Sequence, residues 1–257
     1  SETGGPMVKP EEAMKKLVWS ETMVKGGQTF TGKLTRPSGK NGKFQDAASG
    51  NQSPSFYKDA IVMAYRLPDD EVNMIELHPK ISSSSVIKPD IITDGKFGVS
   101  EEIMVNAAIG EAWVQFEFDQ PFETSAITIA AGAKATGFFA QPATGQVLAS
   151  YDGNDFFILT TFPGQSHRPA PSRTYSFATT KAKFYRVAFK PILKDGYDIT
   201  SGIADIGGPQ LPPAAYTVAE IELHHTPRVN QWQDKAAYGL MFEYQSVPTP
   251  ATTNSID

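Results

Sequence analysis

AWVQFEFDQPFETSAITIAAG, residues Ala112 to Gly132, is the stretch that decides the fold. Its first half alternates apolar residues such as Val114 and Phe116 with other residues, and this period of two is typical of a β-strand with one buried face. Asp119 to Pro121 interrupts the run, and Ser125 to Ala131 forms a second apolar segment. We therefore predict a meander of two strands joined by a short polar turn, whose apolar face needs a second layer.

Further strands are indicated on both sides of this stretch. The apolar run Ala60 to Leu67 is typical of a strand covered on both faces, in a central or interfacial position. Asp152-Gly153-Asn154 suits a tight turn, so Gln146 to Tyr151 and Phe156 to Phe162 form a predicted hairpin. The other predicted strands are Ile81 to Val86, Ile91 to Thr93, Phe184 to Phe189 and Thr217 to Leu223. This pattern predicts an all-β fold, a β-sandwich.

The remaining segments are predicted to be a helix, loops and a tail. A short N-terminal helix begins at Pro10, and its apolar stripe of Met14, Leu17 and Val18 must dock on a partner. Lys96 to Gly110 is predicted to be an irregular loop. The longer segment from Lys190 to Pro213 has no periodicity, and such loops are usually functional or disordered. The last residues, VPTPATTNSID, are typical of a solvated tail.

Composition excludes several classes of function. Twenty-three basic against 28 acidic residues give a net charge of −5, and no Lys/Arg stripe is present, which argues against nucleic acid as a partner. No apolar run approaches the roughly 18 residues that span a bilayer, so we expect no membrane partner. The chain has no cysteine, which removes disulfides and thiolate chemistry.

Five short motifs follow one another along the chain. They are a DG turn (Thr93-Asp94-Gly95), a W-x-Q strand (Trp113-Val114-Gln115-Phe116), an S-x-DG hairpin (Ser150-Tyr151-Asp152-Gly153), a Y-R strand (Phe184-Tyr185-Arg186-Val187) and an A-E strand (Ala219-Glu220-Ile221-Glu222-Leu223). This series resembles the discoidin-like, galactose-binding-like jelly roll. The resemblance implies a jelly-roll β-sandwich with its core over residues 81–226.

The flanks carry a second set of motifs. They are Gly4-Gly5-Pro6, Pro10-Glu11, Met14 to Glu21, Gly26-Gly27, Phe56 to Ala60 and Arg228 to Lys235. These stretches look like parts of the large bacterial α-L-rhamnosidase-type glycoside hydrolases, in which β-sandwich domains interrupt a catalytic barrel. The resemblance implies a barrel-derived loop and helix at residues 1–23, a β-sandwich at 24–228, and a return segment with a flexible tail at 229–257. It also implies a periplasmic or secreted location. Neither end has an evident partner within the chain.

Carboxylates and histidines are the residues that hydrolysis would need. Glu220 and Glu222 lie two apart on a predicted strand, about 7 Å from each other, and glycoside hydrolysis uses two carboxyl groups roughly 5 to 9.5 Å apart. Any polar strand face gives this spacing, so we assign no catalytic residue in this chain. His224 and His225 point to opposite faces of the strand, so we expect satisfied surface or edge histidines and no shared metal ion.

A structural calcium ion is implied by the discoidin-like resemblance. Calcium takes oxygen ligands from carboxylates and loop carbonyls, and in these modules it lies between the DG turn and the glutamate of the last strand. The matching residues are Asp94 and Glu220. Lys96 departs from the family pattern, which has Asp or Asn there, and its cation would oppose a metal ion. Asp94 as a simple turn residue remains the other interpretation.

Carbohydrate binding uses exposed aromatic faces beside orienting polar groups. The candidates lie on loops, because strand aromatics such as Phe116 are nearly always in the core. They are Phe138, Phe139, Arg168, Tyr197 and Asp198. Each aromatic has an alternative interpretation, in which it packs against its own sheet, and Trp113 is expected to be a packing residue.

Three hypotheses for function remain open. The first is a non-catalytic β-sandwich of a rhamnosidase-like glycoside hydrolase that scaffolds the catalytic barrel and contacts carbohydrate, such as a plant-type or rhamnose-containing glycan, at its loop end. The second is an autonomous carbohydrate-binding module. The third is a protein-interaction module, which would present a contiguous exposed apolar patch.

Overall fold

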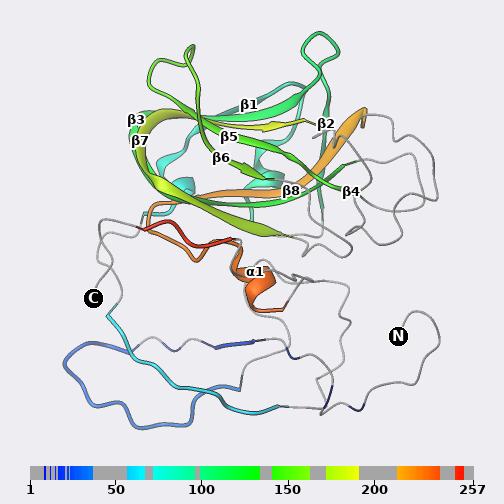
Figure 1. The fold of residues 1–257 in the computed structure, drawn as a ribbon. Helices are drawn as coiled ribbons and strands as arrows, with labels where there is room; N and C mark the ends of the chain where they lie inside the picture. Colours follow the sequence, from blue (N-terminus) through cyan, green and yellow to red (C-terminus); the bar gives the residue numbers. More distant parts are fainter. Residues whose placement is uncertain are drawn as a thin grey trace.

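The computed structural model describes residues 9, 12, 15, 17–20, 22, 24–36, 57–66, 72–95, 99–133, 141–162, 172–190, 213–237 and 247–251. Regular structure in these ranges is almost entirely β-strand (Figure 1). The strands are β1 (Lys80–Ser83), β2 (Glu101–Met104), β3 (Ala112–Ala133), β4 (Gln141–Pro142), β5 (Gly145–Ser150), β6 (Phe157–Phe162), β7 (Arg173–Phe189) and β8 (Ala215–His224). The helices are the 3-10 turns η2 (Met74–Leu77) and η3 (Pro89–Ile92) and the short α1 (Trp232–Lys235). Among the described residues, no helix has the length and apolar character that a membrane crossing requires.

The strands join one antiparallel sheet that folds over on itself. Its order is β2-β8-β3-β7-β5-β6, and β1 and β4 also pair with β3. The first half of β3 lies between β1 and the end of β7, with Phe116 opposite Ile81 and Tyr185. Its second half lies between β8 and the start of β7, with Ile129 opposite Ile221. Because β3 and β7 each run through both layers, the sheet closes into a β-sandwich (Figure 1).

The bend of β3 corrects the predicted meander. Register shifts between Glu117 and Phe122 and between Thr124 and Ala126 mark β-bulges in its pairing with β7, and bulges bend and twist a strand. The exposed Asp119 to Pro121 segment lies at the bend and does not reverse the chain. The two apolar halves are one bent strand, and they pair with other strands instead of with each other.

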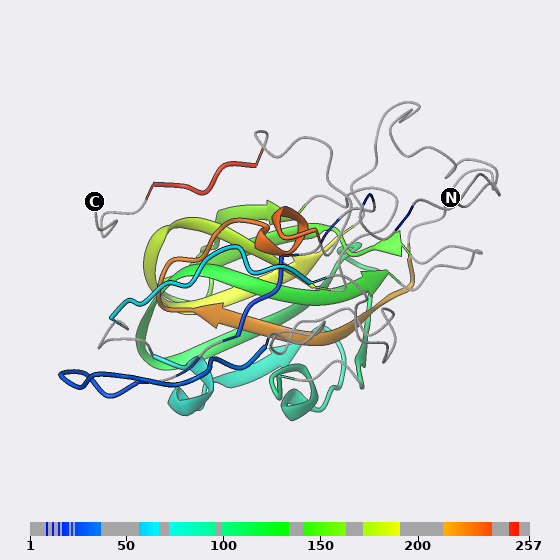
Figure 2. The same ribbon diagram turned by 90° about the horizontal axis from the view of Figure 1, so that it is seen from below.

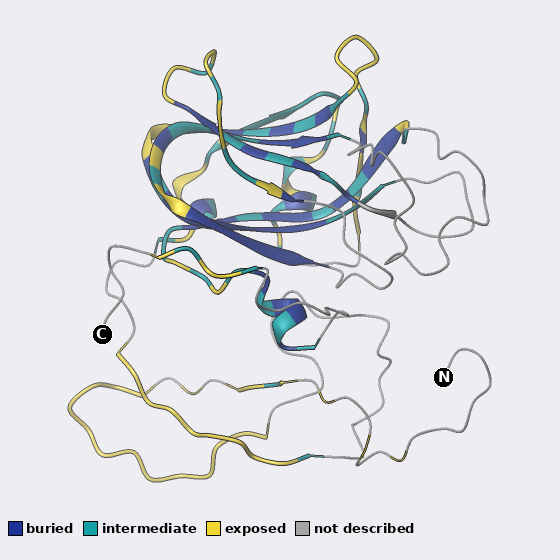
Figure 3. Cartoon of the chain, viewed as in Figure 1, coloured by how far each residue is buried: buried dark blue, intermediate teal, exposed yellow. Residues whose placement is uncertain are grey.

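The hydrophobic core fills the space between the layers (Figure 3). The predicted alternation is confirmed, since Val114, Phe116 and Phe118 are buried. At the bend, the rings of Phe118 and Phe122 stack with centroids 4.8 Å apart, and Tyr185 packs edge-on against both. The aromatic core therefore continues through the bend and supports both halves of β3.

Several predicted elements are confirmed. The hairpin is β5 and β6, and Gly153 at its turn has a φ of +86°, which glycine adopts without strain. The Asp152 carboxylate accepts the amide N–H groups of Asn154 and Asp155 at 2.9 and 3.0 Å. These bonds, with a third from the Ser150 hydroxyl, lower the pKa of Asp152. The predicted strands at 184–189 and 217–223 form parts of β7 and β8.

Other predictions are wrong, each for a local reason. Ile91 and Ile92 belong to η3 instead of a strand, because Pro89 begins a 3-10 turn that places Ile92 in the core. The predicted loop at 96–110 contains β2, which pairs with β8. In the predicted N-terminal helix, Pro10 and Met14 lie outside the described residues, and residues 17–20 are not helical.

The predicted strand at 60–67 is also absent from the described part of this segment. Residues 57–66 carry no strand or β-bridge, and Ile61, Val62, Met63 and Tyr65 are 69 to 73% exposed. In Figure 1 this cyan segment lies below the sandwich, and in Figure 2 it crosses in front of it. The apolar residues are therefore neither central nor covered within this chain.

Candidate functional site

The candidate carbohydrate residues belong to segments that leave the same end of the sandwich. Phe138 and Phe139 follow β3, Arg168 follows β6, and Tyr197 and Asp198 follow β7. All five lie outside the described residues.

The strand ends that flank these segments are neighbours in the sheet. Ala133 at the end of β3 is opposite Tyr216 of β8, and Gly145 of β5 is opposite both Phe162 and Phe189. The topology thus brings the strand ends that flank the three segments to one end of the sandwich.

The two candidate calcium ligands lie on elements that touch. The amide N–H of Gly95, directly after Asp94, donates to Oε2 of the buried Glu220 at 2.6 Å. A hydrogen bond to a carboxylate is stronger than a neutral one, so it fixes the turn to β8. The described residues contain no group of three His, Asp or Glu side chains arranged to hold a metal ion, and Lys96 is not among them. Asp94 and Glu220 thus lie on touching elements, and a calcium ion between them remains a prediction.

The predicted carboxylate pair does not form a shared site. Glu220 bonds to Gly95, whereas Oε1 of Glu222 lies 4.0 Å from Nδ1 of His224. These contacts connect Glu220 to the DG turn and place Glu222 beside His224.

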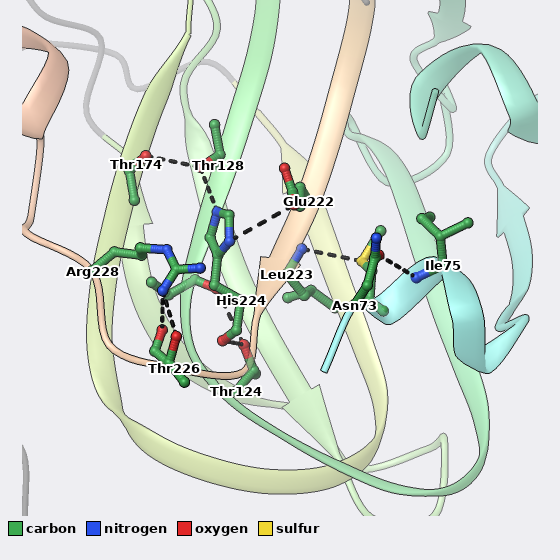
Figure 4. Close-up of polar contacts among 12 residues, drawn as sticks. Asn73, Ile75, Thr124, Thr128, Thr174, Glu222, Leu223, His224, Thr226 and Arg228 are labelled. Atoms are coloured by element: carbon green, nitrogen blue, oxygen red, sulfur yellow. Dashed lines mark hydrogen bonds and ion pairs between the residues drawn. The ribbon is translucent and has the colours of Figure 1, made fainter. Parts of the chain in front are cut away.

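His224 lies in a buried polar row across three strands (Figure 4). Its Nε2 is 2.7 Å from Oγ1 of Thr128, and this hydroxyl is 2.8 Å from that of Thr174. His225 lies on the other face, with Nδ1 2.9 Å from the carbonyl oxygen of Glu123. The two histidines point apart and have partners, as predicted, but His224 is buried instead of being a surface or edge residue.

The W-x-Q and Y-R motifs meet on the outer face of the sandwich. Nε and Nη2 of Arg186 donate to Oε1 of Gln115 at 3.0 and 2.6 Å. The guanidinium carbon lies 3.9 Å from the ring centroid of Phe156 and 5.0 Å from that of Trp113. Burial lowers the pKa of Arg186. These contacts confirm Trp113 as a packing residue, and they explain why the motifs occur together.

An open pocket that the sequence did not predict lies at the bend of β3. Its volume is about 480 Å³, and Leu77, Phe122, Asp119, Glu123, Lys181 and His225 are among the residues that line it. No sequence pattern indicates this pocket, because Asp119 to Pro121 has the composition of an ordinary turn. The pocket holds two carboxylates, which makes it the place to test for hydrolysis.

The return segment is bound to the sandwich by buried polar contacts. Nε and Nη2 of Arg173 donate to the carboxylate of Asp234 at 2.7 and 3.3 Å, and both side chains are buried. Gln233 accepts the amide N–H of Thr174 and donates to its hydroxyl, at 2.9 and 2.8 Å. Asn230 donates to the carbonyl oxygen of Pro248 at 3.2 Å, so part of the predicted tail is held.

The two flanks are partners of each other, which corrects the expectation that neither has a partner. The rings of Trp19 and Trp232 meet edge to face with centroids 5.2 Å apart. The amide N–H of Leu17 donates to the carbonyl oxygen of Ala236 at 3.0 Å, and Val18 packs in the same small apolar cluster. Residues 17–19 and 232–236 therefore lie side by side.

Known proteins resemble the chain in part or throughout. A curated relative from Formosa agariphila, named "Putative beta-glucuronidase", is 33% identical over 104 residues, which cover 40% of this chain and 8% of that protein. Similar solved structures include a pectin-binding carbohydrate-binding module (17% identity, 56% of this chain and 88% of that one, TM-score 0.38). Another is chitosan-binding module 1 of a Paenibacillus sp. IK-5 chitosanase/glucanase (13% identity, 59% and 98%, TM-score 0.40).

The family comparison covers the chain from end to end. Residues 1–257 match the model of the alpha-L-rhamnosidases, glycoside hydrolase family 106. The described sandwich and both of its flanks lie within this match. The chain therefore belongs to the alpha-L-rhamnosidase family, glycoside hydrolase family 106.

Proposed function

We propose that this chain supplies a non-catalytic β-sandwich to a rhamnosidase-like glycoside hydrolase, and that the sandwich scaffolds the catalytic barrel. The observation that carries the proposal is the contact between the flanks at Trp19 and Trp232. A domain inserted into another must leave and rejoin its host at neighbouring points, and adjacent ends permit such insertions. The flanks are the segments whose sequence resembles the barrel.

The buried contacts of the return segment favour a rigid connection between the sandwich and the barrel, as a scaffold requires, instead of a flexible linker. Arg173 and Asp234 pair inside the protein, and Gln233 is fully buried. A charge pair of this kind is costly to break, because either partner alone would be a buried, uncompensated charge. The segment that leads back toward the barrel is thus held in one orientation relative to β7.

The absence of catalysis is tested by incubating the polypeptide with aryl-rhamnosides. We expect no turnover. Asp119→Asn and Glu123→Gln, which alter the two carboxylates of the pocket at the bend, are the variants to compare. Turnover by the original chain that either variant abolishes would refute the non-catalytic assignment.

The sandwich is further proposed to contact carbohydrate at the end where its three connecting segments emerge. Phe138, Phe139 and Tyr197 would offer ring faces, and Arg168 and Asp198 would orient hydroxyl groups. A rhamnose-containing or plant-type glycan is the proposed partner. Phe139→Ala and Tyr197→Ala should weaken binding in calorimetry, whereas Tyr151→Ala, on the exposed β5–β6 turn, should not.

An autonomous carbohydrate-binding module is the second candidate, favoured by the convergence of three connecting segments at one end. It requires saturable binding by this polypeptide without the barrel. Glycan binding that occurs only in the longer protein would favour the scaffold. No binding by either form, across diverse glycans, would remove the carbohydrate contact from both proposals.

A further inference from the structure

Residues 60–66 form an apolar segment without a covering layer in the described structure. Ile61, Val62, Met63 and Tyr65 are 72, 73, 69 and 69% exposed. In an extended chain, successive side chains point to opposite sides, so both faces of this segment are apolar. Large contiguous apolar surfaces on a folded protein mark a contact with another body.

The sandwich does not supply that contact. Its core is closed between its own layers, and the cyan segment lies below the sandwich in Figure 1 and crosses in front of it in Figure 2. The backbone of residues 60–66 forms no β-bridge. Just before the segment, the guanidinium carbon of Arg36 lies 4.2 Å from the centroid of the Tyr57 ring.

The apolar side chains on both faces of residues 60–66 indicate what kind of structure would cover them. A strand that is apolar on both faces needs a layer on each side, and such near-continuous apolar runs are typical of parallel strands in α/β folds. In a barrel, one face packs into the interior and the other packs against the surrounding helices. The segment contains no glycine or proline to interrupt a ladder.

The curated relative is much longer than the segment that it shares with this chain. The 104 residues shared with the curated relative cover 8% of that protein, and the two flanks meet at one place. We infer that residues 60–66 are a parallel β-strand of the catalytic barrel, paired with barrel strands elsewhere in the same polypeptide. This inference rests on the proposed function and adds a strand to the barrel.

The inference moves the start of the inserted sandwich. Asn73 forms a β-bridge with His224, the last residue of β8, and Met74 Sδ accepts the amide N–H of Leu223 at 3.1 Å (Figure 4). The sandwich thus begins at Val72 instead of residue 24. The described residues 24–36 and 57–66 then belong with the flanks.

Hydrogen exchange of the full-length polypeptide tests the strand directly. We expect amides of residues 60–66 to exchange at least about 100-fold more slowly than unprotected amides. The amide of Val86, whose side chain is 99% exposed, serves as the internal control and should exchange fast. Equally fast exchange at 60–66 would overturn the inference.

Variants of the same full-length protein provide a second measurement. Val62→Asp should lower the thermal midpoint by several degrees, whereas Val86→Asp should leave it unchanged. A dimer in light scattering that Val62→Asp converts to a monomer would show that a second copy covers the segment, and would also overturn the inference.

The failure of this inference differs from the failure of the proposed function. Fast exchange at 60–66 in a full-length protein that hydrolyses aryl-rhamnosides would remove the strand and leave the proposed function standing. Protection at 60–66, together with turnover by the sandwich carboxylates, would refute the non-catalytic role and leave the strand in place.

Discussion

The hydroxyl group of Tyr185, on β7, donates a hydrogen bond to the carbonyl oxygen of Phe122, at the bend of β3, at 2.5 Å. The same oxygen accepts the amide N–H of Ala182 at 2.9 Å. Phe122 follows the bulge in β3, and Ala182 lies on the facing part of β7. One phenol therefore joins the two strands where both pass between the layers.

Tyr185→Phe should destabilise the protein by about 1–3 kcal/mol, because the Ala182 amide loses a buried partner. Urea unfolding followed by circular dichroism measures the change. Tyr151→Phe, at a side chain that is 70% exposed, is the control and should stay within about 0.5 kcal/mol of the original. Equal stability of the two variants would contradict the role given to the hydroxyl.

Buried tyrosines should make stability fall at alkaline pH. Burial raises the pKa of Tyr175 and of Tyr216 to about 12, and it also raises that of Tyr185. The unfolded chain ionises near pH 10 and the folded chain does so later, so this contribution is complete below pH 10 and is lost as pH rises toward 12. Phenolate absorbance during a pH titration should show these tyrosines ionising above pH 10 or together with unfolding. Ionisation near pH 10 while the protein stays folded would contradict this prediction.

Asp234→Ala should cost about 3–5 kcal/mol, because it leaves the Arg173 guanidinium buried without a counter-charge. The double variant Arg173→Met, Asp234→Leu should recover much of this loss. Chemical denaturation of the three proteins provides the comparison, with Asp155→Ala, at an exposed side chain, as the control. A single variant as stable as the double one would show that the pair is not coupled.

Gly145→Ala should disrupt the junction of β5, β6 and β7. A Cβ at this position would lie 2.0 Å from the carbonyl oxygen of Ala188 and 2.6 Å from Cζ of Phe162. Overpacking against a backbone costs about 1–3 kcal/mol or more. Gly26→Ala has no atom within 4 Å of its new Cβ and should not reduce the thermal midpoint. Equal midpoints for the two variants would count against this close approach.

Calcium should raise the thermal midpoint if Asp94 and Glu220 hold an ion. A ligand at 100 times its dissociation constant adds about 2.7 kcal/mol to the stability of the folded state. Scans with calcium and with a chelator should differ for the original chain and for Glu76→Gln, but not for Glu220→Gln. Identical scans for the original chain would remove the metal site and leave the Gly95 contact as the role of Glu220.

The strand pattern could be predicted from the sequence because alternation is a local property. Val114 and Phe116 show the buried face of β3, and Asp152-Gly153 shows the turn of the hairpin. The bend at Asp119 to Pro121 could not be distinguished from a reversal, because the same polar residues and proline suit both. Whether the chain bends or reverses at this point depends on which distant strands pair with β3. The local sequence carries no information about that pairing.

The candidate site was predictable to a smaller extent. The DG turn and Glu220, between which the resemblance implies a calcium ion, meet through the Gly95 amide, and the ion itself stays a prediction. The partners of Trp232 and Asp234 lie more than fifty residues away in sequence, at Trp19 and Arg173. No periodicity links such positions. Phe139 and Tyr197 stay predictions for binding experiments.

Asn73 and His224, which face each other across a β-bridge, have a consequence for the history of the gene. Residues opposed in this way have Cα atoms about 4.5–5.5 Å apart, a gap that one tight turn spans. Excising the DNA between their codons would remove the sandwich as a unit, and the polypeptide on either side could be rejoined without stretching. Rhamnosidase genes could thus acquire, exchange or discard this module in a single recombination event.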